Sequence, residues 1–275
     1  MPFTQPGRLA STAHPRYHLD RTRGKRGGAM RLKDKTAIVT GGASGFGMGI
    51  VRKFVAEGAA VIIADLNTDA ATALAGELGQ TAHTVDVSRP GEVTAMAKAA
   101  HHLFGTPDIV VNNAGITHLP QPLEEVSEDD FDRVFAVNCK SVYLTARAFV
   151  PAMKTRGSGT FLNVASTAGV SPRPRLNWYN ASKGWMITAT RALAVELAPS
   201  NIRVNALNPV AGETPLLKSF MGGDTPELRA KFLSTIPMGR FSTPRDMGNA
   251  AAFLCSDEAS MITGVCMEVD GGRCI

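Results

Sequence analysis

The chain has 275 residues, 44% of them hydrophobic, and a formal net charge of +5. This length suits one or two domains, and no run of 18 or more apolar residues predicts a transmembrane helix. Residues 1–29 hold six basic residues and one acidic residue, so the remainder, with 23 of each, is neutral and lacks the basic surface of a nucleic-acid-binding protein.

Residues 1–29 show no apolar periodicity and contain Pro2, Pro6 and Pro15. This composition predicts a disordered basic N-terminal extension. Its arginine-rich, acid-poor character is also compatible with a transit peptide. Met30 directly precedes the first predicted folded residues, so the alternative that translation starts there in the cell also stays open. We therefore place the folded part of the chain, as a single domain, over residues 30–275.

From Lys35 onwards, short apolar runs alternate with helical stretches. Such alternation is typical of a parallel sheet covered by helices on both faces, so we predict one doubly wound α/β Rossmann domain with about seven strands. A first helix should follow the first strand as far as Gly58. The other expected elements are strands over 36–40, 60–64, 82–85, 109–111, 159–164, 202–207 and 265–269, and helices over 69–78, 91–104, 128–157, 178–198 and 244–255.

The segment 209–243 interrupts this alternation. It is long, holds four prolines and carries scattered large apolar residues, which is typical of a lid over a substrate site. Its apolar residues either line a lipophilic pocket or form the core of the lid itself: Leu216, Leu217, Phe220, Met221, Phe232 and Met238.

Cysteine and histidine placement points to no metal site. The four cysteines show no Cys-x-x-Cys spacing, and the adjacent pair His101-His102 faces different sides of a helix. We expect free thiols in a reducing compartment and hence a cytoplasmic location.

A glycine-rich turn joins the first strand to the first helix. It reads Thr40-Gly41-Gly42-Ala43-Ser44-Gly45-Phe46-Gly47, where glycines admit a pyrophosphate next to the free N–H groups of a helix N-terminus. Asp65 ends the second strand, where a carboxylate can accept hydrogen bonds from ribose hydroxyls. The alternative for Asp65 is a simple turn residue at a strand end.

Tyr179-Asn180-Ala181-Ser182-Lys183 is the strongest chemical motif. Tyr179 and Lys183 are four residues apart and share one face of a helix. The ammonium, together with the positive charge of an oxidised nicotinamide, can stabilise a phenolate and bring the phenol towards a useful acid–base pKa. Ser166 ends the fifth strand, at the sheet edge where ligands bind.

Together these motifs make the chain from Met30 to Ile275 resemble the short-chain dehydrogenase/reductase family, whose turn reads Thr-Gly-x-x-x-Gly-x-Gly. The resemblance implies that Tyr179 transfers the proton, Ser166 holds the substrate oxygen and Lys183 holds the nicotinamide ribose. It implies that Asn138 positions a water beside the lysine; the alternative for Asn138 is a buried polar residue.

The resemblance also implies a set of cofactor-binding residues. Members that prefer NADP often carry a basic residue at the position of Ser44, and Leu66 is not basic either, so NAD is the expected cofactor. Of the pair Asn112-Asn113 we favour Asn113 as the residue facing NAD, while Asn112 either has a purely structural role or contacts NAD as well. The expected contacts are Gly41, Ser44, Gly45, Phe46, Gly47, Asp65, Leu66, Asp86, Val87, Asn113, Gly115, Tyr179, Lys183, Gly212 and Thr214.

We therefore predict an NAD(H)-dependent oxidoreductase that transfers a hydride to or from a secondary alcohol or ketone, with no membrane or nucleic acid as partner. Alternatives are a 3-oxoacyl reductase of the acyl-carrier-protein type and an NAD(H)-binding sensor without turnover. The helices 128–157 and 178–198 carry apolar residues on more than one face, which predicts a homo-oligomer, and the family suggests a homotetramer. These residues include Val142, Leu144, Trp185, Met186 and Ile187. Arg173 and Arg175 either recognise an acidic substrate or belong to a solvated loop.

Overall fold

The computed structural model describes residues 30–275, so the predicted disordered extension over 1–29 lies outside the described residues. The described chain builds a seven-stranded sheet of order β3-β2-β1-β4-β5-β6-β7 in which every pairing is parallel. This confirms the predicted Rossmann fold class. The strands are β1 (Thr36–Thr40), β2 (Ala60–Asp65), β3 (Thr81–Thr84), β4 (Ile109–Asn112), β5 (Gly159–Val164), β6 (Ile202–Pro209) and β7 (Cys266–Val269).

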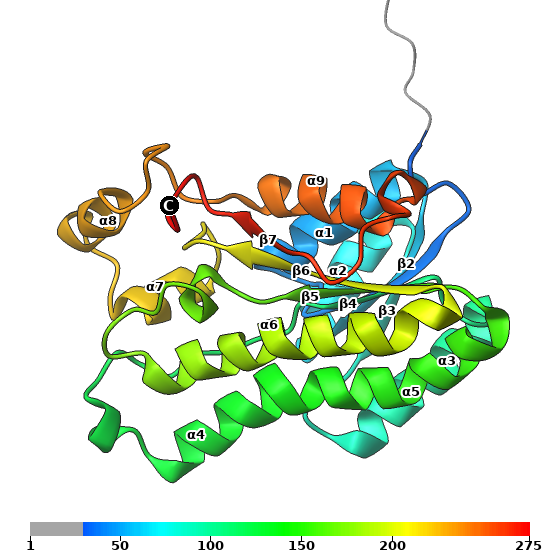
Figure 1. The fold of residues 1–275 in the computed structure, drawn as a ribbon, viewed down its shortest axis with the longest axis horizontal. Coiled ribbons are helices and arrows are strands. Elements are labelled where there is room, and N and C mark those ends of the chain that lie inside the picture. Colours follow the sequence, from blue (N-terminus) through cyan, green and yellow to red (C-terminus); the bar gives the residue numbers. More distant parts are fainter. Residues whose placement is uncertain (1–29) are drawn as a thin grey trace, which may run out of the picture.

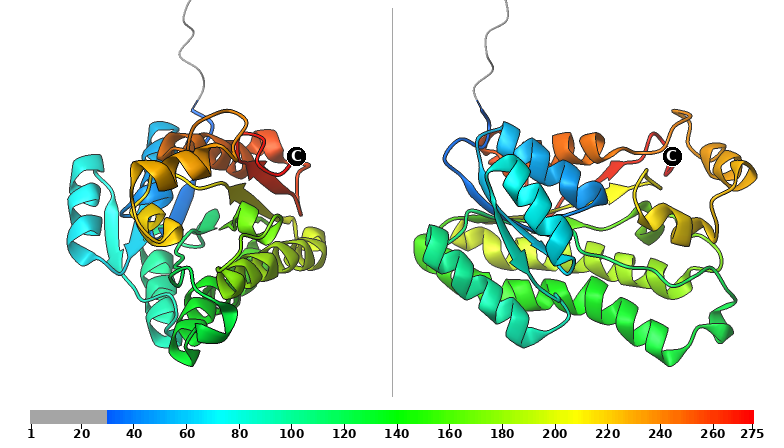
Figure 2. Two further views of the ribbon diagram at one scale, coloured as in Figure 1. Left: turned by 90° about the vertical axis from the view of Figure 1, so that its left-hand side faces the viewer. Right: turned by 180° about the vertical axis from the view of Figure 1, so that it is seen from behind.

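Helices cover both faces of the sheet (Figures 1 and 2). The helices α1 (Gly45–Ala56), α2 (Thr68–Leu78) and α9 (Pro244–Cys255) pack on one face. The helices α3 (Pro90–Phe104), α5 (Ser141–Arg156) and α6 (Asn177–Leu197) pack on the other. Because each face has its own apolar core, the strands read as continuous apolar runs.

The strand order reverses between β1 and β4. β1 pairs with β2 on one side and with β4 on the other, so the chain leaves their carboxyl ends in opposite directions. In open α/β sheets such a switch point forms the ligand crevice. Within residues 30–275, no helix is long and apolar enough to cross a membrane.

The expected helix over 128–157 is two helices joined by a π-helical turn. α4 (Glu128–Phe135) continues through the π-helical residues Ala136–Lys140 into α5. The apolar periodicity gave no sign of this turn, because its residues stay helical in outline while one hydrogen-bond ring widens. Asn138, a predicted site residue, lies inside it.

The segment 209–243 lies beyond the carboxyl ends of the strands and contains α7 (Leu216–Met221) and α8 (Pro226–Leu233) (Figure 1). Its ends meet, since Gly212 and Ser242 form a parallel bridge. Both alternatives for its apolar residues hold in part. Leu217 and Met221 belong to a small core within the segment, whereas Phe220 packs against Tyr179, and Met238 is exposed.

Candidate active site

Glycines shape the turn between β1 and α1. Gly41 and Gly45 have φ values of 60° and 51°, a backbone region that other residues rarely adopt. A Cβ atom at Gly47 would lie 2.0 Å from the Gly41 carbonyl oxygen. Gly47 therefore lets the first turn of α1 pass under the glycine turn.

Asp65 lies at the end of β2, against the same turn. One carboxylate oxygen accepts a hydrogen bond from the Ala43 N–H at 2.9 Å, and the other accepts one from the Asn67 N–H at 2.9 Å. The carboxylate is thus held at the edge of the turn by two backbone donors. Its turn-stabilising role, the alternative raised from the sequence, is compatible with a second role towards a ribose.

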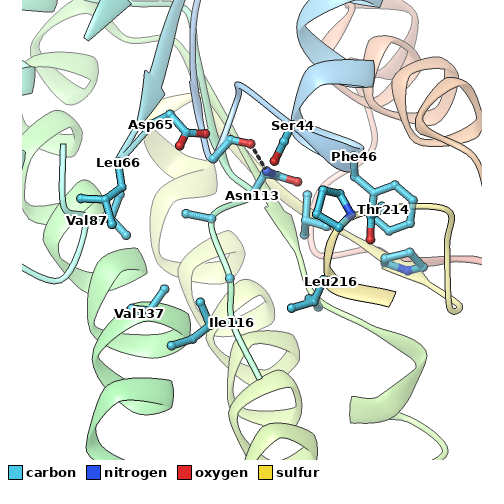
Figure 3. A pocket seen from close by; sticks show the side chains of 18 of the residues that line it. Ser44, Phe46, Asp65, Leu66, Val87, Asn113, Ile116, Val137, Thr214 and Leu216 are labelled. Atoms are coloured by element: carbon cyan, nitrogen blue, oxygen red, sulfur yellow. Dashed lines mark hydrogen bonds between the residues drawn. The ribbon is translucent and has the colours of Figure 1, made fainter. Parts of the chain in front are cut away.

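A cavity of about 460 Å³ opens over this turn (Figure 3). Most of the predicted cofactor residues line it: Gly41, Ser44, Gly45, Phe46, Asp65, Leu66, Asp86, Val87, Asn113, Gly115, Tyr179, Lys183 and Thr214. Among the predicted set, Gly47 and Gly212 do not line this cavity. Asp86 and Val87 reach it from the loop after β3, which ends earlier than expected, at Thr84.

Gly212 has a packing role beside the cavity. A Cβ atom there would lie 2.2 Å from the Phe46 ring, so the glycine allows the start of the lid segment to lie on α1. Thr214 then comes next to Gly45, since a Cβ at Gly45 would be 3.1 Å from the Thr214 Cβ.

Several apolar residues of the cavity wall were not among the predicted cofactor contacts. Ile116 and Val137 are two of them, and Leu216, which the sequence analysis placed among the apolar residues of the segment 209–243, also lines the cavity (Figure 3). Aliphatic side chains carry no chemical signature. Only the position of Ile116, directly after the Asn-Asn-Ala-Gly motif, could have singled one of them out.

The two asparagines after β4 are both tied to the protein. The Asn112 amide donates to the Asn163 side chain at 2.9 Å and its oxygen accepts from Thr145, which joins β4 to β5 and α5. The Asn113 amide donates to the carbonyl oxygens of Thr40 and Gly41, both at 2.9 Å. The dashed line at Asn113 in Figure 3 marks a hydrogen bond of this amide to the glycine turn. Asn113 lines the cavity, but its amide N–H groups hold the glycine turn in place.

Tyr179 and Lys183 lie on one face of α6 and both are buried, with 5% and 4% of their surfaces exposed. The lysine ammonium donates to the Val164 carbonyl oxygen at 2.9 Å, which anchors it at the end of β5. Burial lowers the pKa of Lys183 to about 8, because the charged form loses its hydration.

Burial acts on the phenol in the opposite sense. It raises the pKa of Tyr179 to about 12, while a hydrogen bond with Ser166 lowers it. In this structure the pKa of the phenol is therefore above its ordinary value, so the charge of Lys183 does not by itself lower it. Additional positive charge is needed at the site to stabilise a phenolate.

Asn138 connects α6 to the loop after β4. Its oxygen accepts from the Ile116 N–H at 2.9 Å, and its amide donates to the Ile116 carbonyl oxygen and to the Ser182 hydroxyl. A Cβ at Gly115 would lie 3.3 Å from the Lys183 ammonium and 3.4 Å from the Asn138 oxygen. Asn138 and Lys183 thus meet at this glycine, which itself lines the cavity.

Comparison with known proteins decides the family. Residues 41–273 match a family model described as enoyl-(acyl carrier protein) reductase, a short-chain dehydrogenase/reductase model. The chain belongs to the short-chain dehydrogenase/reductase family. It is an NAD-linked oxidoreductase acting on CH–OH donors, as the sequence predicted.

Individual relatives differ in the substrates that their names state. A 4-formylbenzenesulfonate dehydrogenase of Comamonas testosteroni is 50% identical over 253 residues, which is 89% of this chain and 99% of the relative. An NAD(+)-dependent 2-dehydro-3-deoxy-L-rhamnonate dehydrogenase of a Sphingomonas strain is 37% identical, covering 89% and 97%. The crystal structure of a Brucella melitensis 3-ketoacyl-(acyl-carrier-protein) reductase with NADH superposes with a TM-score of 0.84 at 50% identity, covering 89% of this chain and all of that one.

Proposed function

We propose that the cavity between the glycine turn and α6 is the active site, and that Asn138, Ser166, Tyr179 and Lys183 carry the reaction. The observation that carries this proposal is the burial of Tyr179 and Lys183 on one helix face at the inner end of the cavity. Ser166 follows β5 and lines an adjoining hollow together with Tyr179.

The residues of this cavity fit NAD. Glycines at positions 41, 45 and 115 leave its floor free of side chains, and Asp65 stands at the end where an adenosine ribose would bind. Bound NAD supplies the hydride acceptor and, in its oxidised form, the positive charge that the buried phenol lacks.

The chain's own groups handle the proton. During alcohol oxidation the Tyr179 phenolate takes the proton of the substrate hydroxyl, and the Ser166 hydroxyl holds the substrate oxygen by a hydrogen bond. The hydride would pass from the substrate carbon to the bound NAD. In ketone reduction Tyr179 returns that proton. Lys183 holds the nicotinamide ribose, and Asn138, next to the lysine at Gly115, positions a water through which the proton reaches solvent.

We also propose a preference for NAD over NADP, set by Asp65. The 2′-phosphate of NADP would face this carboxylate, and the nearby cavity residues Ser44 and Leu66 carry no positive charge. The lid assignment for 209–243 is part of the same proposal. It is supported by the contact of Phe220 with Tyr179, whose ring centroids are 5.5 Å apart.

A homotetramer remains a proposal, and its support has changed. Val142, Leu144, Met186 and Ile187, which suggested exposed apolar faces, are buried within the monomer. Exposed large side chains on α5 and α6 now support assembly: Tyr143 (52% exposed), Trp185 (38%) and Val195 (79%). The cysteines at 139, 255, 266 and 274 are free thiols, which supports the proposed cytoplasmic location.

A substrate screen tests the proposed function. Purified protein is mixed with NAD and a panel of secondary alcohols, or with NADH and ketones, aldehydes and an acetoacetyl thioester, while absorbance at the nicotinamide band is followed. Turnover of alcohols and ketones is expected. Thioester reduction alone would favour the acyl-carrier-protein type, and NADH binding without turnover of any substrate would favour the sensor.

A further inference from the structure

Arg173 lies on the loop between Ser166 and Tyr179 and reaches the lid. Its guanidinium carbon lies 4.4 Å from the centroid of the Phe232 ring, and one nitrogen donates to the Thr235 hydroxyl at 3.3 Å. Arg175, two residues further on, is exposed and has a φ of 66°. The two arginines that the sequence placed together therefore have different surroundings.

Arg273 approaches the same loop from the C-terminal segment. One guanidinium nitrogen donates to the Ser171 hydroxyl at 3.1 Å, and its Nε is buried without a hydrogen-bond partner. The Gly271 carbonyl accepts from the Met238 N–H at 3.1 Å, so this segment lies against the end of the lid. Figure 1 shows the C-terminus at that end of the sheet.

The two guanidinium groups approach the same loop, because Arg273 binds Ser171, two residues before Arg173. Burial, and then the charge of Arg273, lower the pKa of Arg173 to about 10, which leaves the group charged at neutral pH. Two like charges in a half-buried place repel each other and lose hydration, so the arrangement costs free energy unless an anion offsets it.

Residues 30–275 supply no such anion. No carboxylate in this range lies within 4.0 Å of either guanidinium. The nearby acids of the C-terminal segment are engaged elsewhere: Asp270 accepts from the N–H groups of Gly272 and Cys274, and Glu268 accepts from Asn208.

An aromatic path leads from this pair of cations to the catalytic tyrosine. The Phe232 ring under Arg173 contacts Phe220 at 5.9 Å between centroids, and Phe220 contacts Tyr179 at 5.5 Å. These edge-to-face contacts connect Arg173 to Tyr179 through one continuous apolar cluster, so a substrate that reaches both must present an apolar body between its charged end and its reacting carbon.

We propose that Arg173 and Arg273 form a subsite for the oxyanion of the substrate, a carboxylate or sulfonate carried at the far end of an apolar body. This inference rests on the proposed function, because it assumes that the carbonyl or alcohol carbon binds at Tyr179. It narrows the sequence hypothesis of an acidic substrate by replacing Arg175 with Arg273, which the sequence places 98 residues further along the chain.

The test measures binding rather than turnover, so it is independent of the catalytic roles. Calorimetry on the full chain with NADH compares benzenesulfonate and naphthalene-2-sulfonate with the uncharged benzenesulfonamide and naphthalene-2-sulfonamide. At least one sulfonate should bind about tenfold or more tightly than its matching sulfonamide. Equal affinity within both pairs, or no saturable binding of either sulfonate, overturns the inference.

Variants then assign the preference to the two residues. Arg173→Met and Arg273→Met keep an apolar stem and remove the charge, and each should reduce the sulfonate preference at least tenfold while leaving NADH binding unchanged. Arg175→Met is the matched control on the same exposed loop and should leave the preference intact. If the sulfonate preference survives in both variants, the assignment is overturned. It is also overturned if the variants keep the preference but change the molecular mass measured by light scattering, because the arginines would then pair with an acid of a second copy.

The carboxylates give a second arm. Benzoate and benzamide, measured the same way, show whether the subsite accepts planar as well as tetrahedral oxyanions. If turnover fails in the alcohol and ketone screen but the sulfonate preference holds, the proposed function fails and the anion subsite stands. If alcohols and ketones are turned over but no anion is preferred, the proposed function stands and the anion subsite fails.

Discussion

The two walls of the proposed active site are built from different parts of the chain. The cofactor wall, comprising the turn 41–47 and Asp65, is shaped by glycine backbone and one carboxylate held by backbone donors. The lid wall, comprising Leu216, Phe220 and Phe232, consists of apolar side chains. A backbone shape requires particular residue types and so is visible in a sequence, whereas an apolar wall can be built from many. This difference explains why the cofactor could be predicted and the substrate could not.

The largest expected effect lies where the walls meet, at Tyr179. Tyr179→Phe removes the proton donor but keeps the ring that packs on Phe220, so kcat should fall about a thousandfold while the Kd of NADH changes little. Stopped-flow turnover and NADH fluorescence titration measure the two quantities. A near-normal kcat in this variant would show that another group transfers the proton.

The cofactor wall predicts the next largest effect. NAD should exceed NADP by about a hundredfold in kcat/KM, because roughly 3 kcal/mol of repulsion between Asp65 and a phosphate already gives that ratio. The double variant Asp65→Ser with Ser44→Arg should reverse the preference, since a guanidinium binds phosphate through paired donors.

Steady-state kinetics with both cofactors decides this prediction. Asp69→Ser, an exposed acid in the first turn of α2, is the control for a general loss of negative charge and should leave the ratio unchanged. Equal kcat/KM for NAD and NADP in the unmodified enzyme would mean that Asp65 serves only the glycine turn.

Changes in the lid wall should have a smaller effect, and this effect should fall on the KM of the substrate rather than on cofactor binding. Phe220→Leu removes the ring that contacts both Tyr179 and Phe232. The KM for the best substrate should therefore rise about tenfold, while the Kd of NADH stays constant. Met238→Leu, in the same segment but 68% exposed, should change neither. A rise in the Kd of NADH in Phe220→Leu would show that the two walls are not independent.

The parts of the site that the sequence could not predict have physical reasons in common. The glycine turn, Asp65, Tyr179 and Lys183 were found because each needs a specific residue at a specific spacing. The π-helical turn around Asn138 was missed because helical periodicity does not report a single widened hydrogen-bond ring. Arg273 was missed because it meets the β5–α6 loop only in the folded chain, where β6 separates β7 from β5 and the segment after β7 reaches back to Ser171.

The pKa of Tyr179 shows a further limit. The Tyr-x-x-x-Lys spacing predicted that the lysine would lower it, yet burial of both groups dominates. Spacing along a helix fixes which side chains are neighbours but not how much water surrounds them. The electrostatics of the site therefore had to come from the fold.

The smallest expected effect is on stability, and it concerns the cost of placing Lys183 between the two walls. Its pKa is about 8 in the folded chain and 10.5 in its ordinary state, an interval worth about 3 kcal/mol. Below pH 8 the folded state holds a buried charge that the unfolded state would hold in water. As pH rises from 8 towards 10.5 the folded lysine is neutral while the unfolded one still binds a proton, so this contribution to stability increases with pH.

Lys183→Met should therefore melt a few degrees higher than the unmodified enzyme at pH 7, after about 1–3 kcal/mol is subtracted for the Val164 carbonyl left without a donor. The difference should shrink, and then reverse, between pH 7 and pH 9.5, a range that stays below the titration of Tyr179. Lys183→Arg keeps the charge and should show no such gain at pH 7. Thermal melts of the three proteins across this range provide the measurement. A difference in Tm that is constant with pH would mean that Lys183 stays charged in the folded chain throughout, and that the burial of its ammonium is offset by contacts other than the Val164 carbonyl.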